Sequence, residues 1–141
     1  EVKLDIEMKW QGGFKFSGKT MYGHEISTDG SKKIGGKEDG YQPLELLIFG
    51  LAGCTGIDVI LIAEKMRLEI TDLKIKVKAE QREENPRAFK NAHIEYIFKG
   101  NNLKKEKLEK IIVMSEEKYC SASATLAGMV KITHSCKIVG D

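Results

Sequence analysis

The chain has 141 residues, of which 41% are hydrophobic and 31% are charged. This length fits one domain with one hydrophobic core, and the composition is typical of a soluble globular protein. The net charge of +2 is too small to favour nucleic acid as a partner, and three widely spaced cysteines exclude a disulfide-rich secreted framework. We therefore expect a single cytoplasmic domain over residues 1–141, in which a cysteine pair is more often catalytic or metal-binding than structural.

The N-terminal third predicts a small sheet. Apolar and polar residues alternate over residues 2–10, which predicts a strand with one buried face. A turn at residues 11–13 follows, and residues 14–16 and 20–26 predict the next strands of a meander. Residues 28–40 contain four glycines and predict a loop.

Residues 43–67 predict a long central helix. Pro43 suits a first helical turn, and Glu45 and Asp58 are the only charged residues from position 44 to position 63. A helix that is apolar on almost every side should be buried on all sides. Its length would also span a bilayer, but two carboxylates would then lie in lipid, so we favour a core helix.

Two glycines flank a cysteine within this helix. Gly53 and Gly56 each lower helix propensity by roughly 1 kcal/mol. This destabilisation predicts that another backbone, or a substrate, approaches Cys54 closely.

The C-terminal half predicts a hairpin, two helices and a last strand. Residues 73–79 and 89–98 predict an antiparallel hairpin, joined by residues 83–87, with Ile94, Tyr96 and Phe98 on one face. Residues 103–119 predict a helix with an N-cap at Asn101–Asn102. Residues 121–127 predict a short helix, and residues 130–139 predict a last strand. The buried stripe of the longer helix should contain Leu108, Ile111, Ile112, Ser115 and Tyr119.

This order places strands in runs, so we predict an α+β fold with mainly antiparallel sheets.

Cys54 and Cys120 are the principal candidates for chemistry. Both lie among small residues, which let two helices approach within the roughly 4.4–6.8 Å between Cα atoms that a disulfide needs. If the two meet, one thiol could attack a peroxide and the other could resolve the resulting sulfenic acid. A buried cysteine is otherwise an inert small hydrophobe, and the sequence alone does not show that these two meet.

Two carboxylates are candidates for supporting roles. Asp58 lies one helical turn beyond Cys54, where it could orient a cation near the thiolate or bond to a neighbouring backbone or hydroxyl group. Glu45 lies nine residues before Cys54, on the opposite side of an ideal helix. It could serve the site of a neighbouring subunit or place charge in the first turn.

A thiolate at Cys54 needs a nearby cation, because the middle of a helix gains little from the helix dipole. Lys15 and Lys19 are the main candidates. Further candidate cations are Lys32, Lys33, Lys37 and Arg67.

His134 and Cys136 share one face of the last strand. This pair lacks two further metal ligands, so we expect an edge strand with a partly buried thiol, no metal site and no cofactor.

Two cysteine segments resemble those of a known family. Residues 42–47, Gln-Pro-Leu-Glu-Leu-Leu, run to Gly53-Cys54 as in the central helix of the OsmC/Ohr family of osmotically induced and organic-hydroperoxide-resistance proteins. Residues 117–123, Glu-Lys-Tyr-Cys-Ser-Ala-Ser, are similar to its second cysteine segment, and residues 53–59 resemble the less characterised branch. The resemblance implies an OsmC-like fold, with antiparallel sheets around a long buried central helix, in an intertwined homodimer with sites at the interface.

The resemblance also implies an activity. It is that of a cysteine-based peroxidase for organic hydroperoxides in oxidative stress, with Cys54 peroxidatic and Cys120 resolving, and with a small or lipoyl-type dithiol as reductant. No metal, flavin, nucleic acid or membrane is implied.

The chain departs from the peroxidase branches at one point. Those branches support the thiolate with an N-terminal arginine held by a glutamate, but no arginine precedes Arg67 here, and Glu45 lies one position later than the glutamate of the organic-hydroperoxide branch. Lys15 or Lys19 could substitute, without the planar fork of guanidinium. The alternative is a non-catalytic protein that binds a small apolar ligand or senses redox state at the dimer interface.

Overall fold

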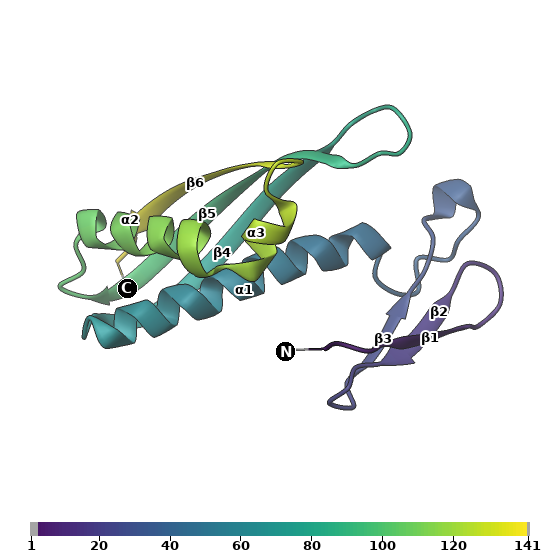
Figure 1. The fold of residues 1–141 in the computed structure, drawn as a ribbon, viewed down its shortest axis with the longest axis horizontal. Coiled ribbons are helices and arrows are strands. Elements are labelled where there is room, and N and C mark those ends of the chain that lie inside the picture. Colours follow the sequence, from purple (N-terminus) through teal and green to yellow (C-terminus); the bar gives the residue numbers. More distant parts are fainter. Residues whose placement is uncertain (1–2, 141) are drawn as a thin grey trace. The chain divides into compact units, whose positions relative to one another are not determined.

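The computed structural model describes residues 3–140, which form two compact units, one reaching to Leu47 and the other beginning at Ile48 (Figure 1). The order of elements is three strands, a long helix, two strands, two helices and a last strand. This order confirms the predicted α+β class, whereas the single domain stays a prediction.

The N-terminal unit contains an antiparallel meander of β1 (Glu7–Trp10), β2 (Phe16–Lys19) and β3 (Glu25–Thr28). The predicted first strand was too long, and Val2 lies outside the described residues. Glu7 pairs with Lys19, where β2 ends, so no residue of β2 lies opposite the residues before Glu7. All four residues of β1 are exposed within this chain, so the predicted buried face is also wrong.

Residues 20–24 form a turn rather than the predicted strand. The hydroxyl oxygen of Thr20 accepts the N–H groups of Tyr22 and His24, and the Thr20 carbonyl accepts the N–H of Gly23. Gly23 has φ +87°, which glycine adopts without steric strain. Local side-chain bonds of this kind favour a turn over a strand.

The loop after β3 is organised around a buried carboxylate. Asp29 is 4% exposed and accepts the backbone N–H groups of Gly30, Lys37 and Asp39 at 2.7, 3.3 and 3.0 Å. The bond from Asp39 is the largest of the effects that lower the pKa of Asp29, because it favours the charged form. A short 3₁₀ helix, Lys32–Ile34, lies within the same loop.

The central helix, α1 (Pro43–Lys65), begins at its predicted first residue and ends at Lys65 rather than at Arg67. Its buried residues, Leu51, Thr55, Val59 and Ala63, recur at every fourth position and form one stripe. Ile57 is 65% exposed, so the expectation of burial on all sides is wrong for the single chain. The sheet and helices that pack beside α1 cover only one of its faces, so the opposite face stays exposed in the single chain. The helix is long and apolar enough to cross a membrane, but core helices of soluble proteins pass the same test.

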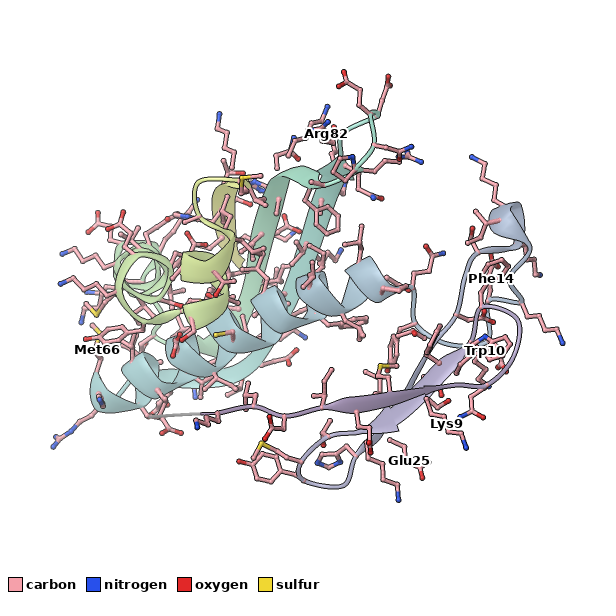
Figure 2. The ribbon with its side chains drawn as sticks, turned by 45° about the vertical axis from the view of Figure 1, so that its right-hand side comes forward. Lys9, Trp10, Phe14, Glu25, Met66 and Arg82 are labelled. Carbon is pink, nitrogen blue, oxygen red and sulfur yellow. The ribbon has the colours of Figure 1, made fainter. Side chains whose placement is uncertain are left out.

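The second unit contains the sheet β4 (Glu69–Gln81), β5 (Phe89–Asn101) and β6 (Lys131–Ile138), in that order. Ile94, Tyr96 and Phe98 alternate along β5 on one face, as predicted, and all three are fully buried. The helices of this unit lie on one side of the sheet (Figure 1). Arg82 lies at the connection between β4 and β5, and Met66 directly follows α1 (Figure 2). The hairpin of β4 and β5 is antiparallel, but β6 runs parallel to β5, because a helical crossover returns the chain to the same end of the sheet.

The crossover consists of α2 (Lys105–Met114), a π-helical turn (Ser115–Tyr119) and α3 (Ser121–Leu126). Tyr119 is 57% exposed, contrary to prediction, since the wider π turn breaks the 3.6-residue period. The predicted cap at Asn101–Asn102 is also wrong, because Asn101 ends β5 and its side chain donates to Glu69. The other four predicted stripe residues, Leu108, Ile111, Ile112 and Ser115, are buried.

Substitution of Asp29 should change stability in a pH-dependent way. The folded-state pKa of Asp29 lies below its ordinary value of 3.8. Its carboxylate therefore stabilises the fold fully above that value, and the stabilisation is lost as pH falls through the lower folded-state pKa. We expect Asp29→Asn to lower the urea midpoint at neutral pH and to leave it unchanged in strong acid.

The fluorescence of Trp10, the sole tryptophan, reports unfolding of the same unit (Figure 2). Asp5→Asn is the control, since Asp5 is exposed. Equal midpoints for wild type and Asp29→Asn at neutral pH would contradict the role of this carboxylate.

Candidate functional site

Two cysteines and an aspartate meet in the second unit. The Sγ atoms of Cys54 and Cys120 and a carboxylate oxygen of Asp58 all lie within 4.8 Å of one another. Both thiols are free. The structure therefore brings together the two cysteines on which the redox hypothesis depends, together with Asp58.

The local structure fixes the direction of each of these side chains. Cys54 and Asp58 lie four residues apart on α1, so their side chains project from the same face of the helix. Cys120 is the N-cap of α3, and its Sγ accepts the N–H of Ser123 at 3.4 Å. The N–H of Cys120 donates to the carbonyl of Ser115 at 2.7 Å, which closes the π turn.

The two thiols have different environments. Cys120 is 2% exposed, and burial is the main cause of its raised pKa, with the nearby Cys54 thiol adding to the effect and the bonds from Ser123 opposing it. Cys54 is only partly buried. Cys120 is therefore held as a neutral thiol, whereas Cys54 is the more accessible of the two.

Asp58 has an unusual environment. Its Oδ2 is buried and has no hydrogen-bond partner among the residues that the structure describes. A buried polar atom without a partner is unfavourable by about 1–3 kcal/mol, and by more when it is charged. Neither expected role, as an acceptor from a hydroxyl or backbone group or as the partner of a cation, is met at this oxygen within residues 3–140.

A buried hydroxyl cluster lies directly beside the thiols. Thr55 Oγ1 is 2.8 Å from Tyr96 Oη and 2.8 Å from Ser115 Oγ, and all three residues are fully buried. These bonds join α1 to β5 and to the π turn. Burial also raises the pKa of Tyr96 strongly, so its phenol stays neutral.

The hydroxyl cluster continues into a chain of ionisable groups. Tyr96 Oη donates to Glu116 at 3.1 Å, and Glu116 also contacts His134 Nδ1 at 3.0 Å. The other nitrogen of His134 is 3.2 Å from Glu109, which accepts the thiol of Cys136 at 3.4 Å. Burial and then Glu109 raise the pKa of Cys136 to about 11, so this thiol is protonated at neutral pH.

This series of hydrogen-bonded groups accounts for the surroundings of His134 and Cys136 on the last strand. Cys136 lies on β6, an edge strand as expected, but its thiol is buried rather than partly buried. Sequence reasoning did not identify the partners, Thr55, Tyr96, Ser115, Glu109 and Glu116, as members of a site. The available signal was a tyrosine on a buried strand face, because a buried phenol requires a hydrogen-bond partner.

Of the remaining candidates, Arg67 is an exposed residue just after α1 in the second unit, and the others lie in the N-terminal unit. Lys15 forms an ion pair with Asp39 at 2.7 Å, and Lys19 lies 3.8 Å from Glu25. Glu45 Oε1 accepts the N–H of Gln42, as in a helix-capping box. The catalytic roles of these three side chains stay predictions.

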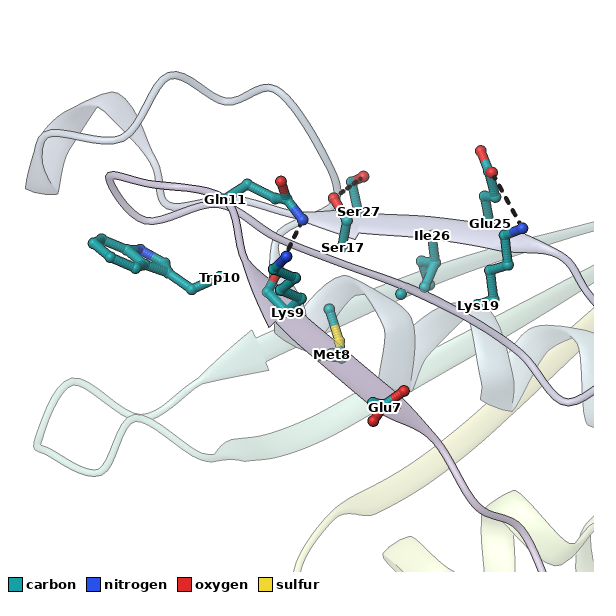
Figure 3. Close-up of a pocket in the computed structure, with 11 residues that line it drawn as sticks. Glu7, Met8, Lys9, Trp10, Gln11, Ser17, Lys19, Glu25, Ile26 and Ser27 are labelled. Carbon is teal, nitrogen blue, oxygen red and sulfur yellow. Dashed lines mark hydrogen bonds and ion pairs between the residues drawn. The ribbon is translucent and has the colours of Figure 1, made fainter.

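The N-terminal unit carries its own hollow of about 910 Å³ along its sheet (Figure 3). Met8 and Ile26 line it, and the ion pair of Lys19 and Glu25 lies at its edge (Figure 3). Its lining includes no cysteine or histidine, so we do not assign redox chemistry to it.

An apolar groove of about 660 Å³ lies between α1 and β4. Gly53 and Gly56 both line it, together with Ile57 and Ile75. A Cβ added at Gly56 would lie 3.1 Å from the Cδ1 of Ile75, whereas one at Gly53 would meet no described atom within 4 Å. The close approach predicted near Cys54 is thus found at Gly56, from a side chain rather than a backbone, and is not found at Gly53 within residues 3–140.

Comparison with known proteins gives consistent matches. The model of the OsmC-like protein family matches residues 36–135. Protein YhfA of Escherichia coli K12 is 35% identical over 136 residues, which cover 96% of this chain and 98% of that protein.

Two solved structures extend the comparison. A hypothetical protein from Aquifex aeolicus superposes with a TM-score of 0.87 at 28% identity, covering 100% of this chain and 99% of the other. The organic hydroperoxide resistance protein OhrB of Bacillus subtilis superposes with a TM-score of 0.68 at 19% identity, covering 96% and 98%. At that identity, the likeness to OhrB shows the fold alone.

Thr55→Val should destabilise the protein by about 1–3 kcal/mol, because the change retains the side chain's shape and leaves two buried hydroxyls short of a partner. Urea unfolding followed by circular dichroism measures this loss. The matched control is Thr133→Val, which removes a hydroxyl that bonds to His93 on an exposed part of β6. Equal losses in the two variants would show that the buried hydroxyl cluster stabilises the fold no more than an exposed hydrogen bond does.

Proposed function

Because the chain belongs to the OsmC-like family, we propose that it is a thiol peroxidase that reduces organic hydroperoxides through Cys54 and Cys120. The observation that carries this proposal is the approach of the two Sγ atoms to within 4.8 Å in the reduced protein. A disulfide between them needs only a small further movement of side chains that already face one another.

The reaction has two steps in the protein. The Cys54 thiolate attacks one oxygen of the hydroperoxide, the O–O bond breaks, and an alcohol leaves after taking up a proton, while Cys54 becomes a sulfenic acid. The Cys120 thiol then attacks that sulfur, so that a disulfide forms and water leaves. A dithiol reductant restores both thiols by exchange and becomes a disulfide itself.

The environments of the two cysteines support these roles. The attacking thiol must be reachable by a peroxide, and Cys54 is the more exposed of the pair. The resolving thiol acts within the protein, which suits the buried Cys120. Lys15 and Lys19 are the cations that we propose for the thiolate, although each already pairs with a carboxylate in its own unit.

We also propose a cytoplasmic homodimer. Its support is the apolar surface that α1 leaves exposed in the single chain, where Ile57 is 65% and Leu61 is 49% exposed. Burial of such side chains is worth about 1.5–3 kcal/mol each. The same surface lines part of the groove beside β4, so a second chain could cover this groove.

The alternative is a non-catalytic protein that holds a small apolar ligand or senses redox state. The apolar groove between α1 and β4 favours this reading.

One equivalent of an alkyl hydroperoxide should link Cys54 to Cys120, lowering the intact mass by about two units as two thiol hydrogens leave. In Cys120→Ser, a sulfenic acid at Cys54 should become trappable. Peptide mapping and a peroxide-consumption assay with a dithiol measure both effects.

Cys136→Ser is the matched control, because Cys136 is bonded to Glu109 rather than to the thiol pair. We expect it to consume peroxide at the wild-type rate. A disulfide that contains Cys136, or a Cys54 that stays reduced, would reject the assigned roles and favour the binding protein.

The dimer should depend on the exposed face of α1. We expect Ile57→Glu to weaken the dimer at least tenfold, or about 1.4 kcal/mol, because it places a charge in an apolar interface. Sedimentation measures the dissociation constant, and the unfolding midpoint of the wild type should rise with protein concentration. Met129→Glu is the control at another exposed apolar residue; a folded wild-type monomer at micromolar concentration would refute the dimer.

A further inference from the structure

The cluster of Cys54, Asp58 and Cys120 would carry three negative charges with both thiols deprotonated, whereas the proposed peroxidase reaction uses one thiolate. We infer that, in the reduced protein, these three side chains bind a thiophilic divalent cation of the type of Zn²⁺. This inference does not rest on the peroxidase proposal, because it concerns only the reduced thiols and the carboxylate. It departs from the sequence-based expectation that the chain has no metal site.

The donor atoms have the chemistry and spacing of a zinc site. Two sulfur atoms and one carboxylate oxygen lie within 4.8 Å of one another. Small side-chain rotations would bring them to the usual zinc distances of about 2.3 Å for sulfur and about 2.0–2.2 Å for carboxylate oxygen. Thiolates select zinc and other thiophilic metals over magnesium and calcium, which prefer oxygen ligands alone.

The environment of Asp58 provides an independent argument. Its Oδ2 is buried and has no donor among the residues from 3 to 140. Within that part of the chain no ion pair is found at Asp58 either. A bound cation would satisfy this oxygen, and it would offset the repulsion between the carboxylate and two thiolates.

The elements that carry the ligands hold them in place. Cys54 and Asp58 project from successive turns of one helix, whose rotation is fixed by the bonds of Thr55 to Tyr96 and Ser115. The backbone of Cys120 is held by its bond to Ser115. A site built on rigid elements in this way loses little conformational entropy when the metal binds.

Binding would be a proton-coupled exchange without a redox step. Each cysteine gives up its thiol proton, so two protons leave as two metal–sulfur bonds and one metal–oxygen bond form. The cluster contains three protein ligands among the described residues, which leaves the fourth tetrahedral position to water or a small ligand. Because both sulfurs are used, metal binding and a Cys54–Cys120 disulfide exclude one another.

Cobalt(II) is the probe for this site, since thiolate–cobalt charge-transfer absorption reports sulfur ligands directly. Titration of the reduced protein should give this absorption, saturate at one equivalent per chain, and disappear when Zn²⁺ is added in competition. Cys54→Ser and Cys120→Ser should each lose most of the absorption, and Asp58→Asn should weaken cobalt binding by about tenfold or more while keeping the thiolate absorption.

Cys136→Ser is the control, because its thiol bonds to Glu109 and lies outside the cluster. It should bind cobalt as the wild type does, and far-ultraviolet circular dichroism checks that each variant is folded. Absence of thiolate absorption in the wild type, or absorption that survives both cysteine variants, would overturn the site. Unchanged affinity in folded Asp58→Asn would overturn the assignment of the third ligand. A protein that binds cobalt in this pattern but does not consume peroxide would keep the metal site and reject the proposed enzyme.

Discussion

The hydroxyl of Thr55 sets the geometry on which the rest of the site depends. It is fully buried, and its bonds to Tyr96 and Ser115 join α1, the central strand of the second sheet and the π turn. A buried hydroxyl that loses its partners is unfavourable by more than an ordinary hydrogen bond contributes, so these three elements have one favourable arrangement. Since Thr55 directly follows Cys54, this arrangement also fixes the side of α1 from which Cys54 faces Cys120.

The three cysteines show how environment separates chemically identical groups. Cys136 donates to a carboxylate and is buried on the edge strand, which keeps it protonated. Cys120 is buried as a helix cap, whereas Cys54 is partly open and faces both Cys120 and Asp58. The proposed oxidation and the proposed metal binding use the same two sulfurs, so the state of the thiol pair would decide between them.

Local patterns in the sequence predicted most elements, because each depends on near neighbours. Strand alternation predicted which residues of β5 share one face, and the helical period predicted four of the five stripe residues of α2 and the π turn. The turn at Thr20 was missed because its side-chain bonds compete with an alternating pattern that reads as strand. The parallel direction of β6 and the network from Thr55 to Cys136 depend on contacts between distant segments, which no local period encodes.

The two thiols of the cluster are far apart in the chain although close in space. From residue 54 to residue 120 the chain advances by 120 − 54 = 66 positions, through α1, the hairpin and α2. A bond that closes a loop of this size removes conformational freedom from the unfolded chain, worth about 4 kcal/mol in the chain-entropy model. Each cycle of the proposed oxidation and reduction would therefore raise and then lower the free energy of unfolding. The thermal stability of the protein would then depend on the ratio of oxidant to reductant in its surroundings.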